Sequence, residues 1–309
     1  MKTTSEVSHK GILWVNLPEQ TEKELLKLQK KFGFDHNDIK ESLPPFQRAK
    51  IVKRDHYYFM VLHFPVFDRE TRRLGFTEID FFLSSNLLVT VHDNKLAILD
   101  NFFDQCRKDV EFREQFFNGT AVHILFELVS RLLEAIFQIL LHVNEDINQV
   151  DGKLFVNRLS SRDMAEEILR LKTNIVTFRR TMMGHRTVLE RLIMYSGREL
   201  DLFSYQSYIN NLREFANEIW HILESQKESI NALHEANESI LSLRTNEVMK
   251  TLTSISVVTF PLTLVAALFA IDAPGRPFVD IPGGFWIITG LIGLGAILMI
   301  LIFKRKDWM

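Results

Sequence analysis

Residues 252–271 read LTSISVVTFPLTLVAALFAI and contain no charged side chain. A second uncharged run, IPGGFWIITGLIGLGAILMILIF, occupies residues 281–303 near the C-terminal end. An α-helix rises about 1.5 Å per residue, so roughly 20 residues cross the ~30 Å hydrocarbon layer of a bilayer. Both runs reach that length. The sequence therefore predicts two transmembrane helices joined by a short loop.

Basic residues flank the outer ends of the two runs. Lys250 lies just before the first run, and Lys-Arg-Lys at residues 304–306 follows the second. Because cytoplasmic flanks of membrane helices carry an excess of Lys and Arg, we expect both termini in the cytoplasm. Residues 272–282 then form an extracytoplasmic loop, residues 283–303 the second span, and residues 304–309 a basic cytoplasmic tail that contacts membrane lipid.

The composition of the whole chain excludes several classes of protein. The 309 residues carry 37 Lys and Arg against 39 Asp and Glu, a net charge of -2, which argues against a nucleic-acid partner. The single cysteine, Cys106, excludes an internal disulfide and a multi-cysteine zinc site. No phosphate-binding glycine loop, His-Glu-x-x-His motif or nucleophile elbow is present in the sequence. We therefore expect neither an enzyme nor an ATP-driven pump.

Residues 121–143 are also rich in apolar residues but carry a polar stripe. Its members, His123, Glu127, Arg131 and Glu134, recur at spacings of three and four and so share one helical face. A lipid-facing helix would bury these charges at a cost of several kcal/mol each, on the order of the penalties measured at a bilayer centre. This segment is predicted to be an amphipathic cytoplasmic helix.

The first hundred residues mix strand and helix signals. The predicted strands span residues 12–15, 57–67, 76–83 and 87–92. Two short helices are expected at residues 21–31 and 35–42, the first opened by a capping box of Thr21 and Glu24. Residues 1–115 are therefore interpreted as an α+β cytoplasmic domain with a small sheet.

Helical patterns dominate from residue 95 to the membrane. The predicted helices span residues 95–113, 121–150 and 162–195. Residues 116–200 are thus expected to form a cytoplasmic helical hairpin region. Residues 201–271 are predicted to form one stalk helix that continues into the first span. Between residue 201 and Pro261 the sequence contains no Pro or Gly that would interrupt it.

A heptad-like seam of apolar residues follows the stalk at spacings of three and four. Its members are Leu212, Phe215, Ile219, Ile222, Gln226, Ser229, Leu233, Ala236, Ile240 and Leu243. We interpret this seam as the contact between copies of the stalk in an oligomer. The alternative is a stalk that packs only on the helices that precede it in its own chain.

A second stripe continues into the first span, one position away from the seam. Its members are Asn246, Met249, Thr253, Ser256, Phe260 and Thr263. Several copies of this helix around an axis would line a narrow channel with polar and apolar rings, and the apolar rings would gate it by dewetting. The alternative is that these hydroxyl groups only form hydrogen bonds within the helix or with neighbouring helices.

Several motifs resemble the CorA family of divalent-cation transporters. They are NEVMKTLT at residues 246–253, FPLT at 260–263 and KRKDW at 304–308, with weaker matches WVN at 14–16 and QRAK at 47–50. The resemblance implies a funnel-shaped homopentamer in the inner (plasma) membrane, built from an α+β cytoplasmic domain, a long stalk helix and two transmembrane helices. It implies Mg²⁺ as the usual cargo, with branches that carry Zn²⁺, Co²⁺ or Ni²⁺, and no permanently bound cofactor.

The chain departs from this family at the end of the first span. Where the family has Gly-Met-Asn as its outer selectivity filter, this sequence has Ala270, Ile271 and Asp272. A ring of Asp272 carboxylates would attract divalent cations and bind them more directly than amides do, which suits Zn²⁺ and other transition metals. The alternative is that Asp272 pairs with Arg276. A second acid of the loop, Asp280, is a candidate for gathering cations at the entrance.

Three functional hypotheses follow from these residues. The first is an Mg²⁺ channel or transporter whose pore is lined by the first span, with Asp272 as a metal-binding ring at the outer mouth. The second is a transporter of Zn²⁺, Co²⁺ or Ni²⁺, coupled to protons. The third is a membrane scaffold or metal sensor that no longer conducts.

Overall fold

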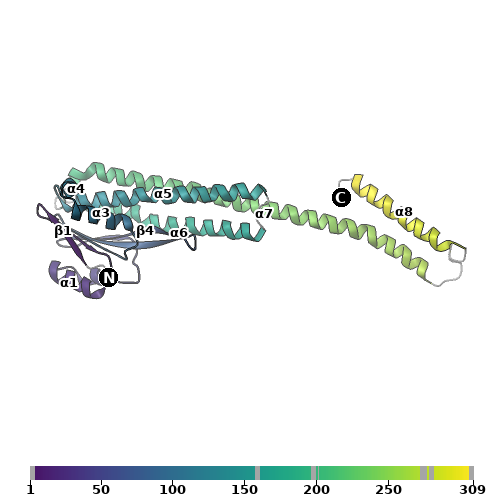
Figure 1. The fold of residues 1–309 in the computed structure, drawn as a ribbon, viewed down its shortest axis with the longest axis horizontal. Coiled ribbons are helices and arrows are strands. Elements are labelled where there is room, and N and C mark those ends of the chain that lie inside the picture. The colour runs from purple at the N-terminus through teal and green to yellow at the C-terminus, as the bar shows by residue number, and fades with distance from the viewer. Residues whose placement is uncertain are drawn as a thin grey trace. The chain divides into compact units, whose positions relative to one another are not determined.

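The computed structural model describes residues 4–156, 161–195, 200, 202–271, 277 and 282–305. The chain divides into two units, Met1–His234 and Glu235–Met309. A single 65-residue helix, α7 (Gln206–Ala270), begins in the first unit and ends in the second (Figure 1). The domain boundaries expected at residues 115 and 200 stay predictions.

A six-stranded sheet with the order β1-β2-β6-β5-β4-β3 lies at the centre of the first unit. Its strands are β1 (Ser5–His9), β2 (Ile12–Leu17), β3 (Lys50–Lys53), β4 (Tyr58–Asp68), β5 (Arg73–Leu83) and β6 (Leu87–His92). The pair β2–β6 is parallel, with Val15 opposite Val89, and the other neighbouring pairs are antiparallel. Parallel neighbours need a long crossover, and here the crossover contains α1, α2 and the β3–β4–β5 meander.

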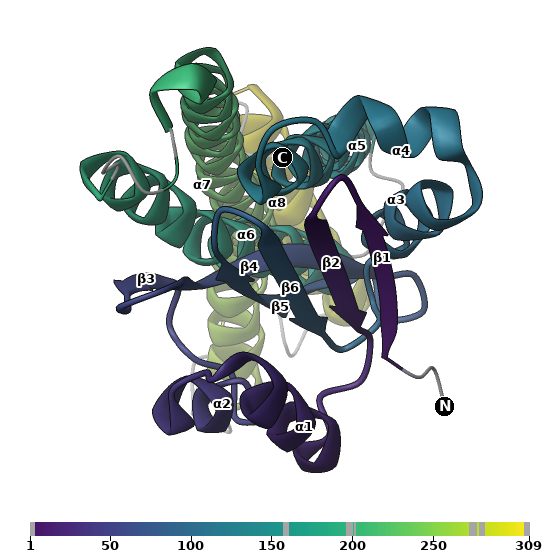
Figure 2. The ribbon, with the colours of Figure 1, turned by 90° about the vertical axis from the view of Figure 1, so that its left-hand side faces the viewer.

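Helices cover both faces of this sheet (Figure 2). The helices of the first unit that precede α7 are α1 (Glu22–Phe32), α2 (His36–Glu41), α3 (Ala97–Lys108), α4 (Val110–Phe116), α5 (Ala121–Val156) and α6 (Ser161–Met194). On one face, Leu25 and Leu28 of α1 join Val15, Phe59 and Val89 of the sheet in a single buried cluster. Because both faces are covered, most residues of the central strands are buried whichever face they point to.

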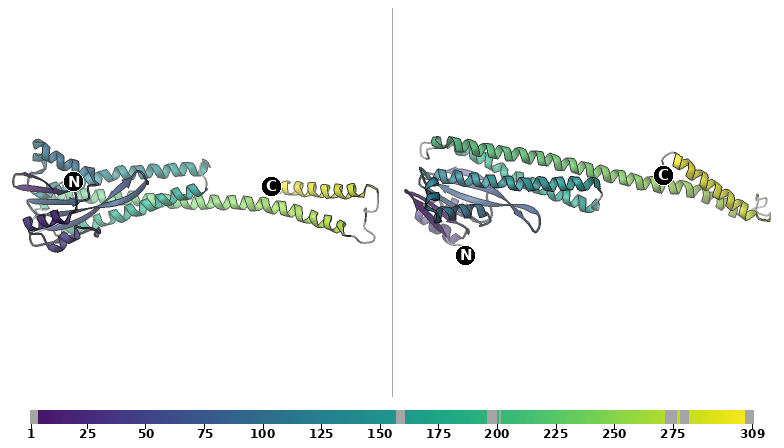
Figure 3. Two further views of the ribbon diagram at one scale, coloured as in Figure 1. Left: turned by 60° about the horizontal axis from the view of Figure 1, so that its bottom comes forward. Right: turned by 45° about the horizontal axis from the view of Figure 1, so that its top comes forward.

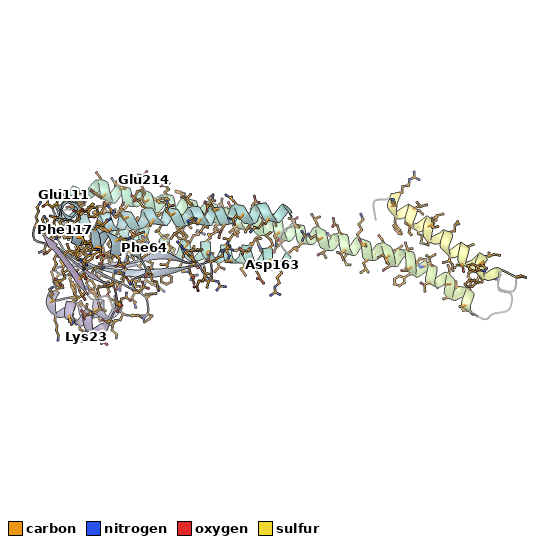
Figure 4. All side chains as sticks on the ribbon, viewed as in Figure 1. Lys23, Phe64, Glu111, Phe117, Asp163 and Glu214 are labelled. Carbon is orange, nitrogen blue, oxygen red and sulfur yellow. The ribbon has the colours of Figure 1, made fainter. Side chains whose placement is uncertain are left out.

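The second face of the sheet packs on α3, α5 and α6 through aromatic side chains. Trp14 of β2 is fully buried, and its ring centroid lies 5.3 Å from Phe102 and 4.9 Å from Phe103. Phe64 of β4, labelled in Figure 4, meets the ring of His185 on α6 at 4.9 Å, close to edge-on. These rings fix the sheet against the helices that follow it in the chain.

The predicted strands at residues 12–15, 57–67, 76–83 and 87–92 are confirmed as β2, β4, β5 and β6, with ends that differ by a few residues. The strands β1 and β3 were not predicted. They are the two edge strands of the sheet. Their short, mixed polar sequences carry no strong strand signal, because an edge strand is paired and buried on fewer sides.

Two predictions about helix ends are wrong. Thr21 precedes α1, but its side chain does not cap the helix; Glu24 is instead bound by Thr4 Oγ1 at 2.9 Å and by Lys27 Nζ at 2.6 Å. The helix expected over residues 95–113 is two helices, α3 and α4. Asp109 separates them, because its carboxylate accepts a hydrogen bond from the Phe112 N–H at 3.1 Å and so caps the start of α4.

The amphipathic interpretation of residues 121–143 is confirmed. They belong to α5, which packs against the sheet and runs beside α6 (Figure 3). Glu127 and Arg131 of the polar stripe form an ion pair at 2.6 Å. Further along the α5–α6 pair, Arg170 joins Asp146 at 3.4 Å and also bonds Glu167. Burial of one face and pairing of charges on the other keep this helix in the soluble unit.

The seam on α7 packs within its own chain in the first unit. Of the residues assigned to the seam, Leu212, Ile219, Gln226 and Leu233 are buried and Phe215 and Ile222 are half-buried, while the buried face also includes Ile209, Ala216, Leu223 and Ile230. Gln226 Nε2 donates to the Leu140 carbonyl of α5 at 2.9 Å, and Arg179 of α6 pairs with Glu224. The seam prediction is therefore corrected: over this part it contacts α5 and α6, as the alternative proposed.

Two details of the predicted stalk also change. Ser229 is exposed, and Ile230 takes its place in the seam. The regular helix begins at Gln206, after a 3-10 turn at Leu202–Tyr205, and not at residue 201. Contact between copies of the chain stays a prediction.

The second unit contains the two apolar helices. By length and composition, α7 and α8 (Gly284–Arg305) are the two described helices that are able to cross a membrane. Their large apolar side chains are exposed in the single chain, among them Leu252 at 57% and Leu294 at 67%. A Cβ atom at Gly295 of α8 would lie 3.4 Å from the Leu262 Cδ2 atom of α7, an ordinary van der Waals distance, so the two helices lie side by side at this point.

Candidate cation pathway

The predicted pore stripe lies on one face of α7 in the second unit. Its members, Asn246, Met249, Thr253, Ser256, Phe260 and Thr263, follow one another at spacings of three and four. Ser256 is half-buried and the other five are exposed. Phe260 is 73% exposed and Met249 is 54% exposed. The stripe is therefore a continuous surface that its own chain leaves open.

The hydroxyl groups of the stripe are anchored to the helix backbone. Ser256 Oγ donates to the Leu252 carbonyl at 2.9 Å, and Thr263 Oγ1 donates to the Thr259 carbonyl at 2.8 Å. These are the intrahelical bonds that the alternative interpretation described. They also leave the hydroxyl oxygens free to accept, since a hydroxyl keeps its lone pairs when its proton is donated. The oxygens can therefore accept a hydrogen bond from the water shell of a cation.

The same bond occurs on Ser and Thr residues outside the stripe. Thr251 Oγ1 donates to the Glu247 carbonyl at 3.0 Å, and Thr259 Oγ1 donates to the Ile255 carbonyl at 2.7 Å. The bond thus reflects Ser and Thr in a helix generally, and it does not by itself distinguish the stripe. The distinguishing feature of the stripe is its alternation of polar and apolar side chains along one exposed face.

Pro261 leaves one backbone carbonyl group of α7 without its usual donor. It lies inside α7, and proline has no backbone N–H to donate. The Val257 carbonyl one turn earlier therefore lacks its usual intrahelical donor. Such a carbonyl oxygen can coordinate a hard cation, or it can accept a hydrogen bond from the hydration water of the cation.

The predicted outer mouth falls only partly within the described residues. Ala270 is the last residue of α7, and Ile271 follows it with 57% of its surface exposed. The C-terminal end of a helix carries unpaired carbonyl groups and a partial negative charge, which favour a cation. Asp272, Arg276 and Asp280 lie outside the described residues, so the proposed carboxylate ring and the proposed Asp272–Arg276 pair stay predictions.

The described residues of one chain hold no ready-made metal cluster. Among the residues that the structure describes, no three His, Cys, Asp or Glu side chains come together to hold a metal ion. The stripe itself offers only neutral oxygens: hydroxyl groups and the Asn246 amide. Neutral oxygens from one side suit a hydrated cation in transit rather than a tightly bound one.

These features define a class of protein: a membrane protein with a soluble α/β unit, a long helix and two terminal apolar helices, the first of which carries an open polar stripe. The sequence model of the family described as CorA-like Mg²⁺ transporter protein matches residues 9–305. The chain belongs to this family, whose members are channels or transporters and not enzymes.

Relatives and solved structures agree with this assignment. The cobalt/magnesium transport protein CorA of Methanocaldococcus jannaschii is 19% identical over 300 residues, which cover 96% of this chain and 91% of the relative. The Thermotoga maritima protein of the same name is 22% identical over 279 residues, covering 90% of this chain and 78% of its own.

The fold is likewise similar to known structures over nearly its whole length. The complete structure of the CorA magnesium transporter from M. jannaschii matches with a TM-score of 0.83 at 18% identity, covering 99% of this chain and 94% of that chain. The full-length CmaX protein matches with a TM-score of 0.74 at 19% identity, covering 96% and 89%. The fold class expected from the sequence, an α+β domain followed by a long helix and two apolar helices, is confirmed.

Proposed function

We propose that this chain carries Mg²⁺ across the inner (plasma) membrane as a homopentamer, through a pore lined by the α7 stripe. The observation that carries the proposal is the stripe itself. It alternates polar and apolar side chains, lies on a helix long enough to span a bilayer, and is left open by its own chain. The magnesium and cobalt/magnesium cargo named for the relatives supports the choice of cation.

A pore of this kind needs several copies of the chain. One helix presents oxygens to one side of a cation only, whereas copies related by a rotation axis surround it. Mg²⁺ gives up its hydration water reluctantly, so rings of hydroxyl and amide groups that bind through that water suit it. The apolar rings of Met249 and Phe260 would close the pathway to water when the helices move together.

The membrane potential is sufficient to drive inward transport. A doubly charged ion that crosses 100 mV releases about 4.6 kcal/mol, twice the value for a single charge. Inward transport driven in this way does not require nucleotide hydrolysis. Both termini are placed in the cytoplasm in this proposal, with residues 272–282 on the opposite side.

The outer mouth is proposed to consist of Ala270, Ile271 and Asp272. A carboxylate ring there would bind divalent cations more strongly than an amide ring, at the cost of mutual repulsion when the site is empty. Asp280 would add to the local concentration of cations at the entrance. Strong carboxylate binding favours Zn²⁺, Co²⁺ and Ni²⁺ more than an amide ring would, and this is the second candidate function.

The proposal is tested by uptake into proteoliposomes that hold a metal-sensitive dye. Mg²⁺, Zn²⁺, Co²⁺ and Ni²⁺ are compared at two pH values under an imposed potential, with wild type, Asp272→Asn, and Glu214→Gln as a control on the exposed face of the first unit. We expect potential-driven Mg²⁺ flux, a changed cation preference in Asp272→Asn only, and a pentameric mass in native mass spectrometry.

Other outcomes would select a rival. Zn²⁺ uptake that depends on an imposed proton gradient, without Mg²⁺ uptake, would replace the proposal by the proton-coupled transition-metal transporter. Absence of any flux from folded, pentameric protein would replace it by the non-conducting scaffold or metal sensor. Flux that is identical in wild type and Asp272→Asn would contradict the proposed role of the carboxylate ring, and it would leave the proposal that the stripe lines the pore unaffected.

A further inference from the structure

A cavity of about 500 Å³ lies in the first unit. Its walls are the segment at residues 46–49, strands β4 and β5, and one face of α6. This volume falls within the roughly 300–1,000 Å³ typical of small-molecule sites. Nothing in the transport proposal uses this cavity.

Two guanidinium groups of the wall have no partner in the described part of the chain. Arg48 comes from the 46–49 segment and Arg180 from α6, and neither forms an ion pair or hydrogen bond there. Four other arginines of α6 do pair with carboxylates, namely Arg162, Arg170, Arg179 and Arg186. The two guanidinium groups thus belong to residues from two different elements that line the same cavity, an arrangement that attracts an anion.

A second part of the wall is apolar and aromatic. The rings of Phe46 and Phe76 lie 5.5 Å apart at a tilt of 56°, and each residue is 39% exposed. Met183 of α6 lines the same cavity and is 62% exposed. Partly exposed aromatic rings next to a flexible thioether form a surface on which a planar ring packs well.

A buried carboxylate next to the wall of the cavity already has its partners. Glu78 is 1% exposed; its Oε2 accepts the Gln47 N–H at 2.6 Å and lies 3.2 Å from His63 Nε2. This carboxylate is therefore held by two residues of the wall and does not itself line the cavity, and the charged residues that do line it are the two arginines and His63 when protonated. Thr177 and Thr187 of α6 add hydroxyl groups to the wall.

The close approach of the two walls depends on a glycine. A Cβ atom at Gly184 of α6 would lie 2.3 Å from the Ala49 Cβ, far inside van der Waals contact. Only glycine lets the 46–49 segment, and with it Arg48, pack directly against α6. The cavity is thus formed by the native packing, and a ligand does not have to create it.

We propose that this cavity, the Arg48–Arg180 pocket, binds a nucleoside phosphate. The arginine pair would hold the phosphate groups by charged, forked hydrogen bonds, and the Phe46–Phe76 wall would hold the base. The threonine hydroxyl groups would meet the sugar. A simple inorganic anion would use only the arginines, so the aromatic wall is the feature that selects a phosphate attached to a planar ring.

The test measures binding to the full-length protein in detergent, by titration calorimetry in EDTA so that cation sites stay empty. The probes are ADP, adenosine and inorganic phosphate. We expect ADP to bind more tightly than either fragment, because only ADP engages both parts of the pocket. Binding is read without transport, so failure of the transport proposal would leave this result unaffected.

Variants assign the binding to the pocket. Arg48→Gln and Arg180→Gln are each expected to weaken ADP binding about tenfold, the usual effect of a lost charged hydrogen bond. Arg191→Gln is the matched control, since Arg191 is an exposed arginine of the same helix that does not line the cavity. Phe46→Ala is expected to reduce the preference for ADP over inorganic phosphate.

Three results would overturn the proposal. The first is absence of ADP binding at millimolar concentration by folded protein. The second is ADP binding that Arg48→Gln and Arg180→Gln reduce no more than Arg191→Gln does. The third is a loss of oligomer mass in the two pocket variants without any ADP binding, which would assign the arginines to a contact between copies of the chain.

Discussion

At the scale of single residues, Asp80 on β5 is the least expected group in the fold. It is fully buried, and its carboxylate forms no ion pair among the described residues. Burial raises the pKa of Asp80 well above its usual range, and the nearby charge of Glu78 raises it further. The folded protein therefore holds a proton on Asp80 at a pH where the unfolded chain has released it.

This linkage predicts the behaviour of Asp80→Asn. The contribution of Asp80 to the free energy of unfolding is largest below about pH 4, which is the pKa of an aspartate in the unfolded chain. This contribution is lost as the pH rises, because the unfolded chain then releases the proton that the folded chain keeps. Each further pH unit costs the wild type about 1.4 kcal/mol while only its folded state keeps the proton. Asp80→Asn, which carries no titrating group, should gain thermal stability relative to wild type between pH 5 and 8.

Thermal unfolding of the full chain in detergent, followed by circular dichroism across this pH range, checks the prediction. Asp151→Asn is the control, because Asp151 is exposed on α5. A stability difference between Asp80→Asn and wild type that does not vary with pH would show that Asp80 is not protonated in the fold.

His185 on α6 titrates in the opposite sense. Burial lowers its pKa from 6.5 to about 4, although the Nε2 atom is bonded to the His63 carbonyl. The unfolded chain binds a proton between these two values and the folded chain does not, so stability should fall as the pH drops from 6.5 to 4. The loss attributable to His185 is about 3 kcal/mol over the window.

Unfolding at pH 7 and pH 4.5 in wild type and His185→Phe measures this contribution. Phenylalanine preserves the ring that packs on Phe64 but cannot be protonated. The acid sensitivity of wild type should exceed that of His185→Phe. Equal acid sensitivity of the two proteins would mean that His185 is already protonated, or is reached by water, in the fold.

At the scale of elements, the first half of α7 is held by its seam against α5 and α6. Leu223 is fully buried in that seam. Leu223→Ala should lower the free energy of unfolding by about 2–5 kcal/mol, because it removes apolar contacts and leaves a cavity. Leu169→Ala is the matched control, since Leu169 on α6 is 64% exposed.

Denaturant unfolding of both variants, followed by circular dichroism, compares the two leucines. A loss for Leu169→Ala as large as that for Leu223→Ala would contradict this account, and would place Leu169 in a contact that the single chain lacks. The comparison therefore separates packing within one chain from packing between copies.

At the scale of the whole molecule, the sole cysteine offers a direct test of topology. Cys106 is fully buried, and burial raises the pKa of its thiol to about 12, so it does not react under mild conditions. Pro277→Cys in the connection between α7 and α8, and Glu214→Cys on the exposed face of the first unit, therefore introduce the only reactive thiols.

A membrane-impermeant maleimide applied to sealed vesicles should label these two variants from opposite sides of the membrane. Labelling before and after the vesicles are opened with detergent gives the readout, and wild type sets the background. Labelling of both variants from the same side would contradict the two-span topology with cytoplasmic termini.

The sequence alone determined the features that depend on local composition. The two apolar helices follow from the uncharged runs, because the thickness of a bilayer fixes the length of a span. The central strands follow from short apolar runs, which are typical of strands buried on both faces. The helix α5 follows from its polar stripe, which recurs with the period of a helix. The alternating stripe of α7 was visible for the same reason.

Only the tertiary structure decided the features that depend on which distant residues meet. The edge strands β1 and β3 exist because neighbouring strands pair with them, and Asp109 ends α3 because its carboxylate caps α4. The packing of Gly184 against Ala49 brings Arg48 and Arg180 to one cavity, and the folding of β5 buries Asp80 without an ion pair in the described part of the chain. Periodicity records which face of an element is buried, but the residues that face each other are fixed only when the elements pack.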